Sequence, residues 1–394
     1  MAEHDPDEKR VDEAIERLLR DHPPGTTPER EFLGHQYDLG LAWVHFPEGH
    51  GGLGVSPRLQ RNVIAAVAAA GGPLGGAKNP IGYGMCAPAV EVHGTDEQKT
   101  LLRPLFTNEH IWCQLFSEPG AGSDVASLAA RAVRDGDEWV LNGQKVWTTL
   151  AHISSYGLII ARSDPEVPKH RGITAFIVDM AAPGVEVKPL RQITGEAEFN
   201  EVFFTDVRLP DSMRLDDVGR GWAVSLTTLM NERVSIGGGV PPRNSGPIGQ
   251  LLEVWADAGG GDAAQRDELT RLWISAEVNR LTNMRAAANR KAGTPGPEGS
   301  VGKLAMAELN KEIYSFAMNV LGAEGMLVSS YSEHPPKVAL FGDDVGKNFL
   351  RARANSIEGG TSEVMRNILG ERVLGLPGEV RVDKELPWSQ VPRS

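Results

Sequence analysis

The amino-acid sequence predicts an α+β protein made of three successive parts: a helical part, a β part and a second helical part. Two changes of hydrophobic period indicate this order, because apolar residues recur every three or four positions in the outer parts and every second position in the middle. The middle strands follow one another without long helices, which favours an antiparallel β-barrel or sandwich over a doubly wound sheet. We expect an N-terminal all-α domain over residues 1–113, a β domain over 114–225, and a C-terminal helical bundle with an irregular tail over 226–394.

The N-terminal part contains three helical patterns. VDEAIERLLR places its apolar residues on one face of a helix: Val11, Ile15, Leu18 and Leu19. RNVIAAVAAAGG predicts an Ala-rich helix that ends on glycines. Thr95 is the expected N-cap of the helix in DEQKTLLRPLF. GHGGLG (49–54) has the spacing of a dinucleotide fingerprint, but it lies in this helical part, so we interpret it as a turn.

The middle part predicts a run of short strands. EWVLNGQKVWTT is expected to form two strands around a hairpin at Asn142–Gly143, because Asn-Gly is the strongest short hairpin signal. SYGLIIARS, GITAFIVD, GVEVKPL and NEVFFTDVRLP follow at short spacing. In the last part, NKEIYSFAMNVLG has helical periodicity, and Gly322 is expected to cap its end.

Composition excludes several classes of protein. The net charge is −12, from 52 acidic and 40 basic residues, which argues against binding to nucleic acid. Cys86 and Cys113 are the two cysteines, and we expect them to be buried free thiols. The acidic N-terminus does not resemble a signal peptide, and no segment has 18 successive apolar residues, so a cytoplasmic protein without a membrane span is expected. No metal-binding motif occurs, so no metal site is expected.

Two motifs point to a ligand with phosphates and a planar ring. SEPGAGSD (117–124) combines glycines and hydroxyls in a loop that can present N–H groups to an anion. VWTT (146–149) places a Trp beside two Thr at a strand end, where an indole can cover a ring system. Taken singly, the first is as consistent with an ordinary turn and the second with a core Trp.

The motifs occur together in one order: S-E-P-x-A-G-S-D, L-N-G-x-K-x-W-T-T, E-G-G-T-S-E-x-M-R-N and E-R-V-L-G-L-P. In this order and spacing, the chain resembles the acyl-CoA dehydrogenase family over about residues 10–378, and that family has the same α–β–α layout. FSEPGAGSDVASL is particularly similar to members found in actinobacteria, including those that act on steroid side chains. The resemblance implies FAD-dependent α,β-dehydrogenation of an acyl-CoA thioester in lipid metabolism, with electrons passed to an electron-transfer flavoprotein.

The resemblance also implies which residues hold the ligands. Leu115, Phe116 and Ser117 would contact the flavin, and Ser123 would lie near the pyrophosphate or the CoA phosphates. Ser123 and Arg233 would bind the substrate. The remaining flavin contacts implied are Trp147, Thr148 and Thr149 over the ring face and near N5, Thr361 and Glu363 at the far end, and Arg243 and Asn319 from a neighbouring subunit toward the adenine half.

The position of the catalytic base departs from the commonest family pattern. Removal of a weakly acidic α proton needs a carboxylate in an apolar site and a hydrogen bond to the thioester carbonyl. In many members the base is the Glu of an apolar-aromatic-Glu-Gly-Thr motif. Alignment on Thr361 puts Gly359 at that position and Glu358 one residue early. A shift of one residue turns a side chain by about 100° in a helix, so Glu358 is expected to point away from the substrate.

Other members of the family place the base on the first long helix of the C-terminal domain, in an x-E-R-x pattern. LMNERVSIGG (229–238) matches this pattern and makes Glu232 the predicted base, with Gly359 supplying its backbone N–H to the carbonyl. The alternative for Glu232 is a solvated carboxylate paired with Arg233 or another cation. The small-residue run SIGGGV (235–240) predicts room for a bulky or branched acyl group, unless the glycines simply end the helix.

Family members usually form dimers of dimers in which FAD lies across a subunit interface. The neighbour's Arg-x-x-Phe-Gly motif here reads RNSGP (243–247), without the Phe, and its Gly-Gly-x-Gly turn reads GAEG (322–325). The chain is therefore expected in a homotetramer, or in a heterotetramer whose paralogous subunit supplies the missing half of the site. Two rival functions remain: a flavin acyl-CoA oxidase, and a non-catalytic subunit that binds acyl-CoA or stabilises a partner.

Overall fold

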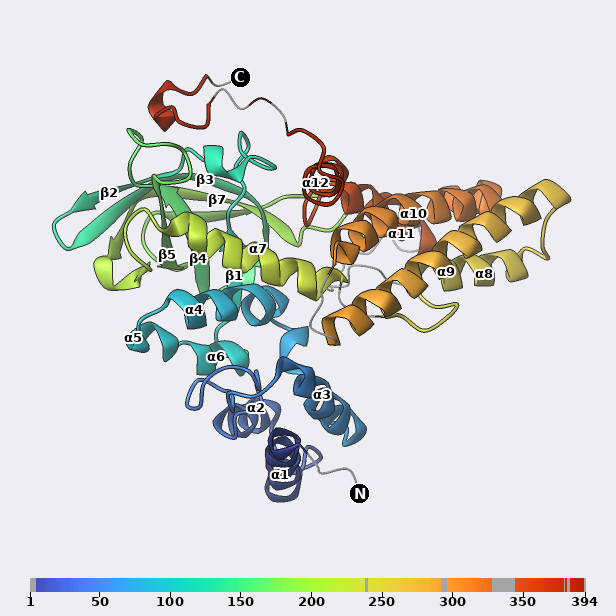
Figure 1. Cartoon of the computed structure of the whole chain (residues 1–394), viewed down its shortest axis with the longest axis horizontal. Coiled ribbons are helices and arrows are strands. Elements are labelled where there is room, and N and C mark those ends of the chain that lie inside the picture. Colours follow the sequence, from blue (N-terminus) through green and yellow to red (C-terminus); the bar gives the residue numbers. More distant parts are fainter. Residues whose placement is uncertain are drawn as a thin grey trace. The chain divides into compact units, whose positions relative to one another are not determined.

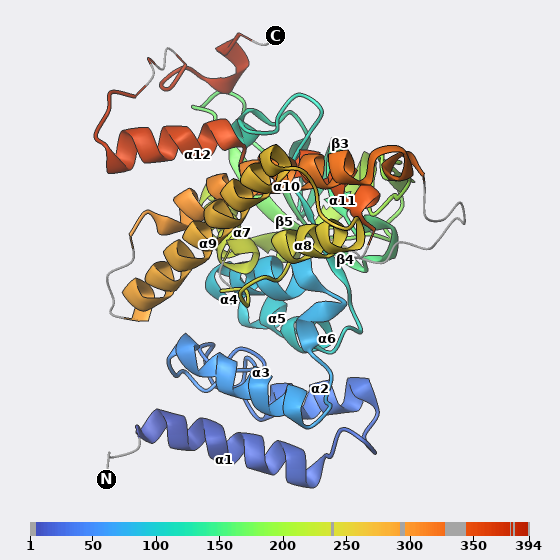
Figure 2. The same ribbon diagram turned by 90° about the vertical axis from the view of Figure 1, so that its right-hand side faces the viewer.

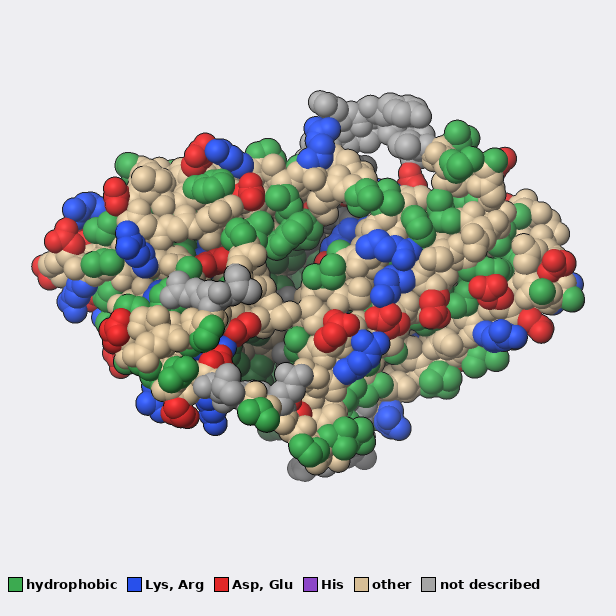
Figure 3. All heavy atoms as spheres, turned by 90° about the horizontal axis from the view of Figure 1, so that it is seen from above, with side chains coloured by type: hydrophobic (Ala, Val, Ile, Leu, Met, Phe, Trp, Pro, Cys, Tyr) green, Lys and Arg blue, Asp and Glu red, His purple; other side chains and the backbone are tan. Residues whose placement is uncertain are grey.

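The computed structural model describes residues 5–237, 240–291, 296–327, 344–378, 380 and 383–392, and the side chains of 77, 232–237, 290, 291 and 298 lie outside the described part. The chain divides into two compact units. The first unit comprises Met1–Leu190, Glu198–Asn231 and Val382–Ser394, and the second comprises Arg191–Ala197 and Glu232–Arg381. Acidic and basic side chains are interspersed over the face shown in Figure 3. Within the described residues, none of the helices has the length and hydropathy needed to cross a bilayer.

The first unit begins with helices (Figures 1 and 2): α1 (Pro6–Asp21), α2 (Glu29–Asp38), α3 (Gln60–Ala69), α4 (Ala87–His93), α5 (Asp96–Lys99) and α6 (Leu102–Phe106). The predicted apolar face of α1 is confirmed, because Val11, Ile15 and Leu18 are buried. Thr95 caps α5 as predicted: its hydroxyl accepts a hydrogen bond from the Gln98 N–H, and the Gln98 side chain accepts one from the Thr95 N–H. The GHGGLG segment forms a turn, as predicted.

An eight-stranded sheet follows: β1 (Trp112–Leu115), β2 (Arg131–Asp135), β3 (Glu138–Thr149), β4 (Tyr156–Arg162), β5 (Ile173–Asp179), β6 (Val185–Pro189), β7 (Phe199–Pro210) and β8 (Arg214–Leu215). The strand order is β6-β7-β3-β2-β4-β5-β8, with β1 paired to β4. The helix–sheet–helix order predicted from the sequence is confirmed. Most pairings are antiparallel, but β1 and β2 each pair with β4 in parallel, so the sheet is mixed.

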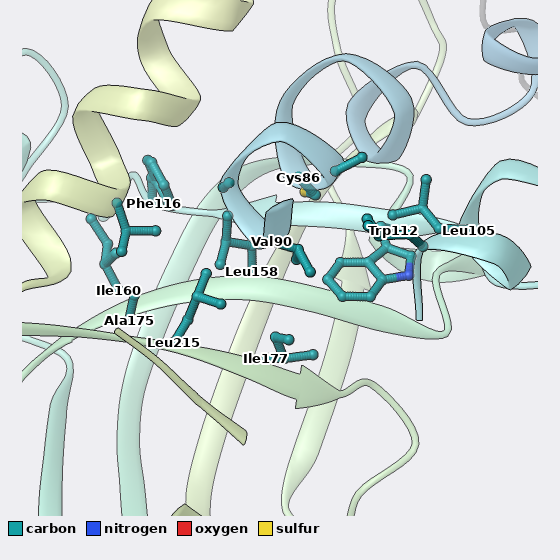
Figure 4. Packing of buried hydrophobic residues seen from close by; sticks show 14 of the residues in the cluster. Cys86, Val90, Leu105, Trp112, Phe116, Leu158, Ile160, Ala175, Ile177 and Leu215 are labelled. Carbon is teal, nitrogen blue, oxygen red and sulfur yellow. The ribbon is translucent and has the colours of Figure 1, made fainter. Parts of the chain in front are cut away.

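Both faces of the central strands are buried. Leu158 and Ile160 of β4 face a cluster that includes Val90 of α4 and Leu105 of α6 (Figure 4). Alternate β4 residues face the opposite cluster, which β3 and β7 also line. This is the two-residue period of a strand. It explains why SYGLIIARS is a continuous apolar run rather than an alternating one. The buried free thiols are also confirmed, and burial raises the pKa of Cys86 well above its usual value.

The predicted hairpin at Asn142–Gly143 is wrong. EWVLNGQKVWTT forms one long strand, β3, and the hairpin lies earlier, where β2 turns into β3. The two-residue turn is Gly136–Asp137, in which Gly136 has φ +63°, so a Gly-Asp pair rather than the Asn-Gly pair makes the reversal. Gly143 instead lies at a register shift between β3 and β7, and a Cβ there would come within 2.5 Å of the Ala130 Cβ. Glycine is required at position 143 because the backbone at Ala130 lies too close to leave room for a side chain.

The second unit is helical: α8 (Pro247–Asp257), α9 (Ala263–Lys291), α10 (Glu298–Leu321), α11 (Val345–Arg351) and α12 (Ser362–Ile368). Helices α8, α9 and α10 pack side by side (Figures 1 and 2). The predicted face of α10 is confirmed, because Ile313, Phe316 and Ala317 are buried in this core. Gly322 follows α10 with φ +56° and ends it. Helix α7 (Gly221–Gly237) begins in the first unit, and its last turns belong to the second.

Candidate functional site

The loop at residues 117–128 is held by a buried ion pair. Lys145 is 0% exposed and its Nζ donates to Glu118 Oε1 at 2.7 Å and to the Phe116 carbonyl at 3.0 Å. The Glu118 carboxylate also accepts the N–H groups of Ala129 at 2.6 Å and Ala130 at 3.0 Å. Burial lowers the pKa of Lys145, while the Glu118 charge opposes that shift. The pair therefore joins the SEPGAGSD motif to the strand that carries the VWTT motif.

Trp147 combines exposure with backbone strain. Its φ is +61°, a left-handed conformation that is rare for a bulky residue. It lies at a register shift between Lys145 and Thr148, and its side chain remains 58% exposed, touching Phe199 edge-on at 6.0 Å. The preceding residue, Val146, donates its N–H to the Ser117 carbonyl at 2.9 Å. Such strain is typical of functional sites, and here it presents an indole face next to the 117–128 loop.

The same loop leaves room beside its backbone. A Cβ built at Gly120 or Gly122 would meet nothing within 4 Å, so packing within the described chain does not require glycine there. Ser123 is exposed and Ser117 half-buried, while the buried Thr148 hydroxyl has no hydrogen-bond partner among the described residues. Leu115 and Phe116 are buried behind the loop, and Thr149 is half-buried. In the first unit the predicted flavin contacts therefore lie on two segments, residues 115–123 and the end of β3, which the hydrogen bond from Val146 to Ser117 joins.

In the second unit, Glu358 is engaged by its own chain. Arg351, whose side chain is 4% exposed, donates to Glu358 Oε2 at 2.6 Å and Oε1 at 3.2 Å. The Asn355 amide donates to Glu358 Oε1 at 2.8 Å. Both carboxylate oxygens therefore accept hydrogen bonds from residues that precede Glu358 by three and seven positions. This agrees with the expectation that Glu358 is not the base.

The turn after Glu358 depends on its two glycines. Gly359 and Gly360 have φ +61° and +94°, which residues with side chains rarely adopt. Lys303 of α10 fixes the turn by donating to the carbonyls of Asn355 and Gly360. Within the described residues, the Gly359 N–H has no hydrogen-bond partner. A free donor in a fixed turn is what a thioester carbonyl requires.

The residues after this turn begin α12. Thr361 is its N-cap, and its hydroxyl accepts the Val364 N–H at 3.1 Å. Glu363 is exposed and lies 3.5 Å from Arg366. Glu232 and Arg233 lie in α7, but their side chains are outside the described residues, as is most of the SIGGGV run. Their assignments remain predictions.

Arg243 is occupied within its own unit. Its guanidinium stacks on Trp273 at 5.0 Å and lies 3.6 Å from Glu277. Glu277 also binds Arg280 at 2.8 Å, and this hydrogen bond, with the charge of Arg243, lowers the pKa of Glu277. Asn319 is exposed near the end of α10. A cavity of about 240 Å³ adjoins this region, lined by residues 241–248, α9 and α10.

Comparison with known proteins identifies the chain's relatives. It matches the acyl-CoA dehydrogenase N-terminal domain over residues 8–109, the middle domain over 113–207 and the C-terminal domain over 219–374. The chain belongs to the acyl-CoA dehydrogenase family. This is a family of oxidoreductases whose members are flavoproteins that use FAD.

Two relatives from Mycobacterium tuberculosis show how much of the chain is shared. It is 40% identical to acyl-CoA dehydrogenase FadE34 over 86% of its own length but spans only 45% of that protein. It is 36% identical to acyl-CoA dehydrogenase IpdE1, covering 87% of this chain and 86% of that one.

Two solved structures have the same fold. The Tcur3481-Tcur3483 steroid ACAD matches with a TM-score of 0.72 at 26% identity, covering 95% of this chain and 94% of that one. The ChsE4-ChsE5 complex from Mycobacterium tuberculosis matches with a TM-score of 0.69 at 30% identity, covering 96% and 100%. The second name describes a complex of two proteins.

Sequence reasoning missed the residues that support the motifs. Glu118 and Lys145 stand inside two quoted motifs, yet nothing in their spacing of 27 residues predicts that they pair. The pairing of Arg351 with Glu358 was easier to predict, because the two residues are only seven positions apart. A basic run alone, however, does not indicate that one of its residues has a buried partner.

Proposed function

We propose that this acyl-CoA dehydrogenase family member binds FAD and catalyses α,β-dehydrogenation of an acyl-CoA thioester. The observation that carries the proposal is Trp147, whose backbone is strained and whose side chain is exposed. It is adjacent to a loop in which packing does not require the glycines Gly120 and Gly122. Strained backbone at a non-glycine residue clusters at functional sites, so the strained and exposed Trp147 supports a ligand that covers its indole. A flat flavin ring with a pyrophosphate fits both features.

The fit of FAD to the first unit rests on unused polar groups. The Thr148 hydroxyl, Ser117 and Ser123 supply hydrogen-bonding groups, and the loop backbone at Gly120 and Gly122 is open to an anion. Trp147 would cover the ring, with Leu115, Phe116 and Thr149 beside it, and Thr361 and Glu363 would meet the far end. When bound, FAD accepts the hydride that leaves the β carbon.

The residues of this chain perform the proton chemistry. We assign the base to Glu232, because both oxygens of Glu358 are held by Arg351 and Asn355. Glu232 would remove the α proton, and the Gly359 N–H would hold the thioester carbonyl so that negative charge developing on its oxygen is stabilised. Arg233 and Ser123 are assigned to the substrate.

The acyl group is proposed to be bulky or branched. The small-residue run 235–240 supports this, and one similar solved structure is named a steroid ACAD. The electron acceptor is proposed to be an electron-transfer flavoprotein. An oxidase is the competing function, and reoxidation of the flavin by oxygen distinguishes the two.

The assembly is proposed to be a tetramer, either of this chain alone or with a paralogous subunit. Ile274, Val278 and Leu281 expose apolar side chains at helical spacing on α9, a surface suited to another subunit. Arg243 is occupied by Trp273 and Glu277, which weakens its contribution to an adenine site. A partner that supplies this half is supported by the similar structure named as the ChsE4-ChsE5 complex.

The test is the colour of the purified protein. We expect a yellow protein, alone or after co-expression with a paralogue, whose flavin is bleached by an acyl-CoA without oxygen and stays bleached when oxygen is admitted. Rapid recovery of the colour would identify an oxidase. Protein that stays colourless in both preparations, or whose flavin no acyl-CoA reduces, would exclude the proposed reaction and favour the non-catalytic subunit. One tightly bound FAD per subunit in an active homotetramer would exclude the heterotetramer.

A further inference from the structure

The C-terminal residues 383–392, here called the strap, lie on the first unit beside the loop between β4 and β5 (Figure 1). Trp388 donates its N–H to the Val167 carbonyl at 2.9 Å, and Ser389 donates to the Pro165 carbonyl at 2.8 Å. Pro387 forms an antiparallel bridge with Pro168. The strap is thus attached by its backbone, which requires a defined register rather than a loose apolar contact.

Beside the strap lies a buried arginine that organises the 117–128 loop. Arg162 is 3% exposed, and its Nη2 donates to the carbonyls of Ala126 at 2.6 Å and Leu128 at 3.3 Å. The Trp388 ring lies 4.8 Å from this guanidinium, and its Nε1 donates to the Ser127 carbonyl at 3.3 Å. Arg162 binds Ala126 and Leu128 and the strap binds Ser127, so together they hold three successive residues at the end of the loop that carries Ser123.

A second link ends on the residue next to Ser123. The Lys169 ammonium lies 2.8 Å from Asp124 and 2.7 Å from Asp383 of the strap. The Ser127 hydroxyl donates to the same Asp124 oxygen at 2.6 Å. One ammonium therefore joins the strap to the loop.

We infer that the strap positions the phosphate-binding loop, with Trp388 and Asp383 acting as positioning residues that hold residues 124–128 so that Ser123 is presented to the FAD or CoA phosphates. This rests on the proposed function, which supplies the ligand. Considered by charge alone, Asp383 would weaken the binding of phosphates, because it brings a carboxylate near an anion site. The two accounts predict changes of opposite sign, so they can be separated.

The experiment compares full-length wild-type protein with W388A, W388F, D383N and E385Q. Binding of FAD to flavin-free protein and of coenzyme A to the FAD-loaded form is measured by calorimetry, with the melting temperature as a check on folding. W388A is expected to raise the dissociation constant about tenfold for either ligand, the size expected from losing one cation–π contact and a hydrogen bond. W388F keeps the ring over Arg162 and is expected to restore most of the affinity.

Two charge variants complete the design. D383N is expected to weaken binding if the strap positions the loop, whereas removal of a repulsive carboxylate alone would strengthen it. E385Q changes an exposed carboxylate in the strap and is expected to bind as wild type does.

The outcomes separate this inference from the proposed function. Wild-type protein that binds FAD while W388A binds it equally well overturns the role of the strap and leaves the proposed function intact. A wild-type chain that binds neither ligand, alone or with a paralogue, overturns both. If W388A does not fold, W388F and D383N decide: unchanged affinity in both overturns the inference, and weaker binding by D383N supports it.

Discussion

Two segments that carry motif residues are each fixed by a glutamate and a basic residue, but not equally firmly. In the first unit Lys145 and Glu118 are 0% and 7% exposed, and two backbone N–H groups complete the contacts of the glutamate. In the second unit Arg351 is buried while Glu358 remains 30% exposed. The first pair makes a rigid support for a strained, exposed Trp. The second holds a turn of two glycines in which the Gly359 N–H has no hydrogen-bond partner among the described residues. In both regions the glutamate accepts hydrogen bonds from its own chain, which supports the proposal that a third carboxylate, Glu232, is the base.

The largest expected effect separates Glu232 from these two structural glutamates. E232Q is predicted to keep FAD bound but to lower the rate of flavin reduction by about four orders of magnitude, the upper range for loss of a general base. E358Q is the matched control, because it makes the same change of carboxylate to amide at another motif glutamate, and it is expected to lose little rate. Stopped-flow reduction by an acyl-CoA measures both. An E358Q protein that binds acyl-CoA but cannot reduce its flavin would reverse the assignment.

Moving the base tests the same assignment from the other side. E232T combined with G359E is expected to recover part of the lost rate. The recovery is limited because Gly359 has φ +61°, a conformation that costs a residue with a side chain about 1 kcal/mol or more. A double variant no faster than E232Q would show that position 359 does not face the substrate.

The next effect tests how firmly the first pair holds its loop. K145M leaves the Glu118 carboxylate buried without its cation and is expected to lower the free energy of unfolding by about 3–5 kcal/mol. Urea unfolding measures this loss, and flavin content per chain is expected to fall with it. K145M combined with E118Q removes both charges and is expected to recover part of the stability. A single variant as stable as wild type would mean that the ion pair does not fix the loop.

The sequence predicted local features of the fold but not the long-range contacts that hold the motif segments. The α1 and α10 faces and the Thr95 cap follow from local periodicity and capping, which depend on residues a few positions apart. The hairpin prediction failed because both Asn142–Gly143 and Gly136–Asp137 are local hairpin signals, and only the pairing of β3 with β7 decides between them. The attachment of the strap to residues 124–128 was beyond local signals, because the segments it joins are more than 200 residues apart.

A smaller effect is expected from the more open pair of the second unit. R351M removes the cation that binds Glu358, and the free energy of unfolding is expected to fall by about 1–3 kcal/mol, because the partly exposed carboxylate regains water. R353M is the control, since Arg353 is an exposed cation two residues away whose contacts are to Phe349 and Ser315. Urea unfolding of the two variants gives the difference. Equal losses of unfolding free energy in R351M and R353M would mean that the ion pair with Glu358 adds no particular stability. A loss in R351M as large as that in K145M would mean that the two ion pairs stabilise their regions equally.

The smallest effect concerns an ion pair on the first unit's sheet, outside both regions. Asp211 accepts hydrogen bonds from Arg214 at 2.8 Å and from the Trp139 indole at 2.7 Å, and both lower the pKa of Asp211. A lowered folded-state pKa stabilises the protein above the unfolded value of about 3.9, and this stability is lost as the pH falls through the folded pKa. D211N is therefore expected to be about 1 kcal/mol less stable than wild type at pH 7, with the difference shrinking as the pH falls below about 4. Urea unfolding of both chains between pH 7 and pH 2.5 measures it. A difference that grows on acidification would contradict the sign. If D211N loses as much unfolding free energy at pH 7 as K145M does, the stabilisation given by the three ion pairs does not follow their burial.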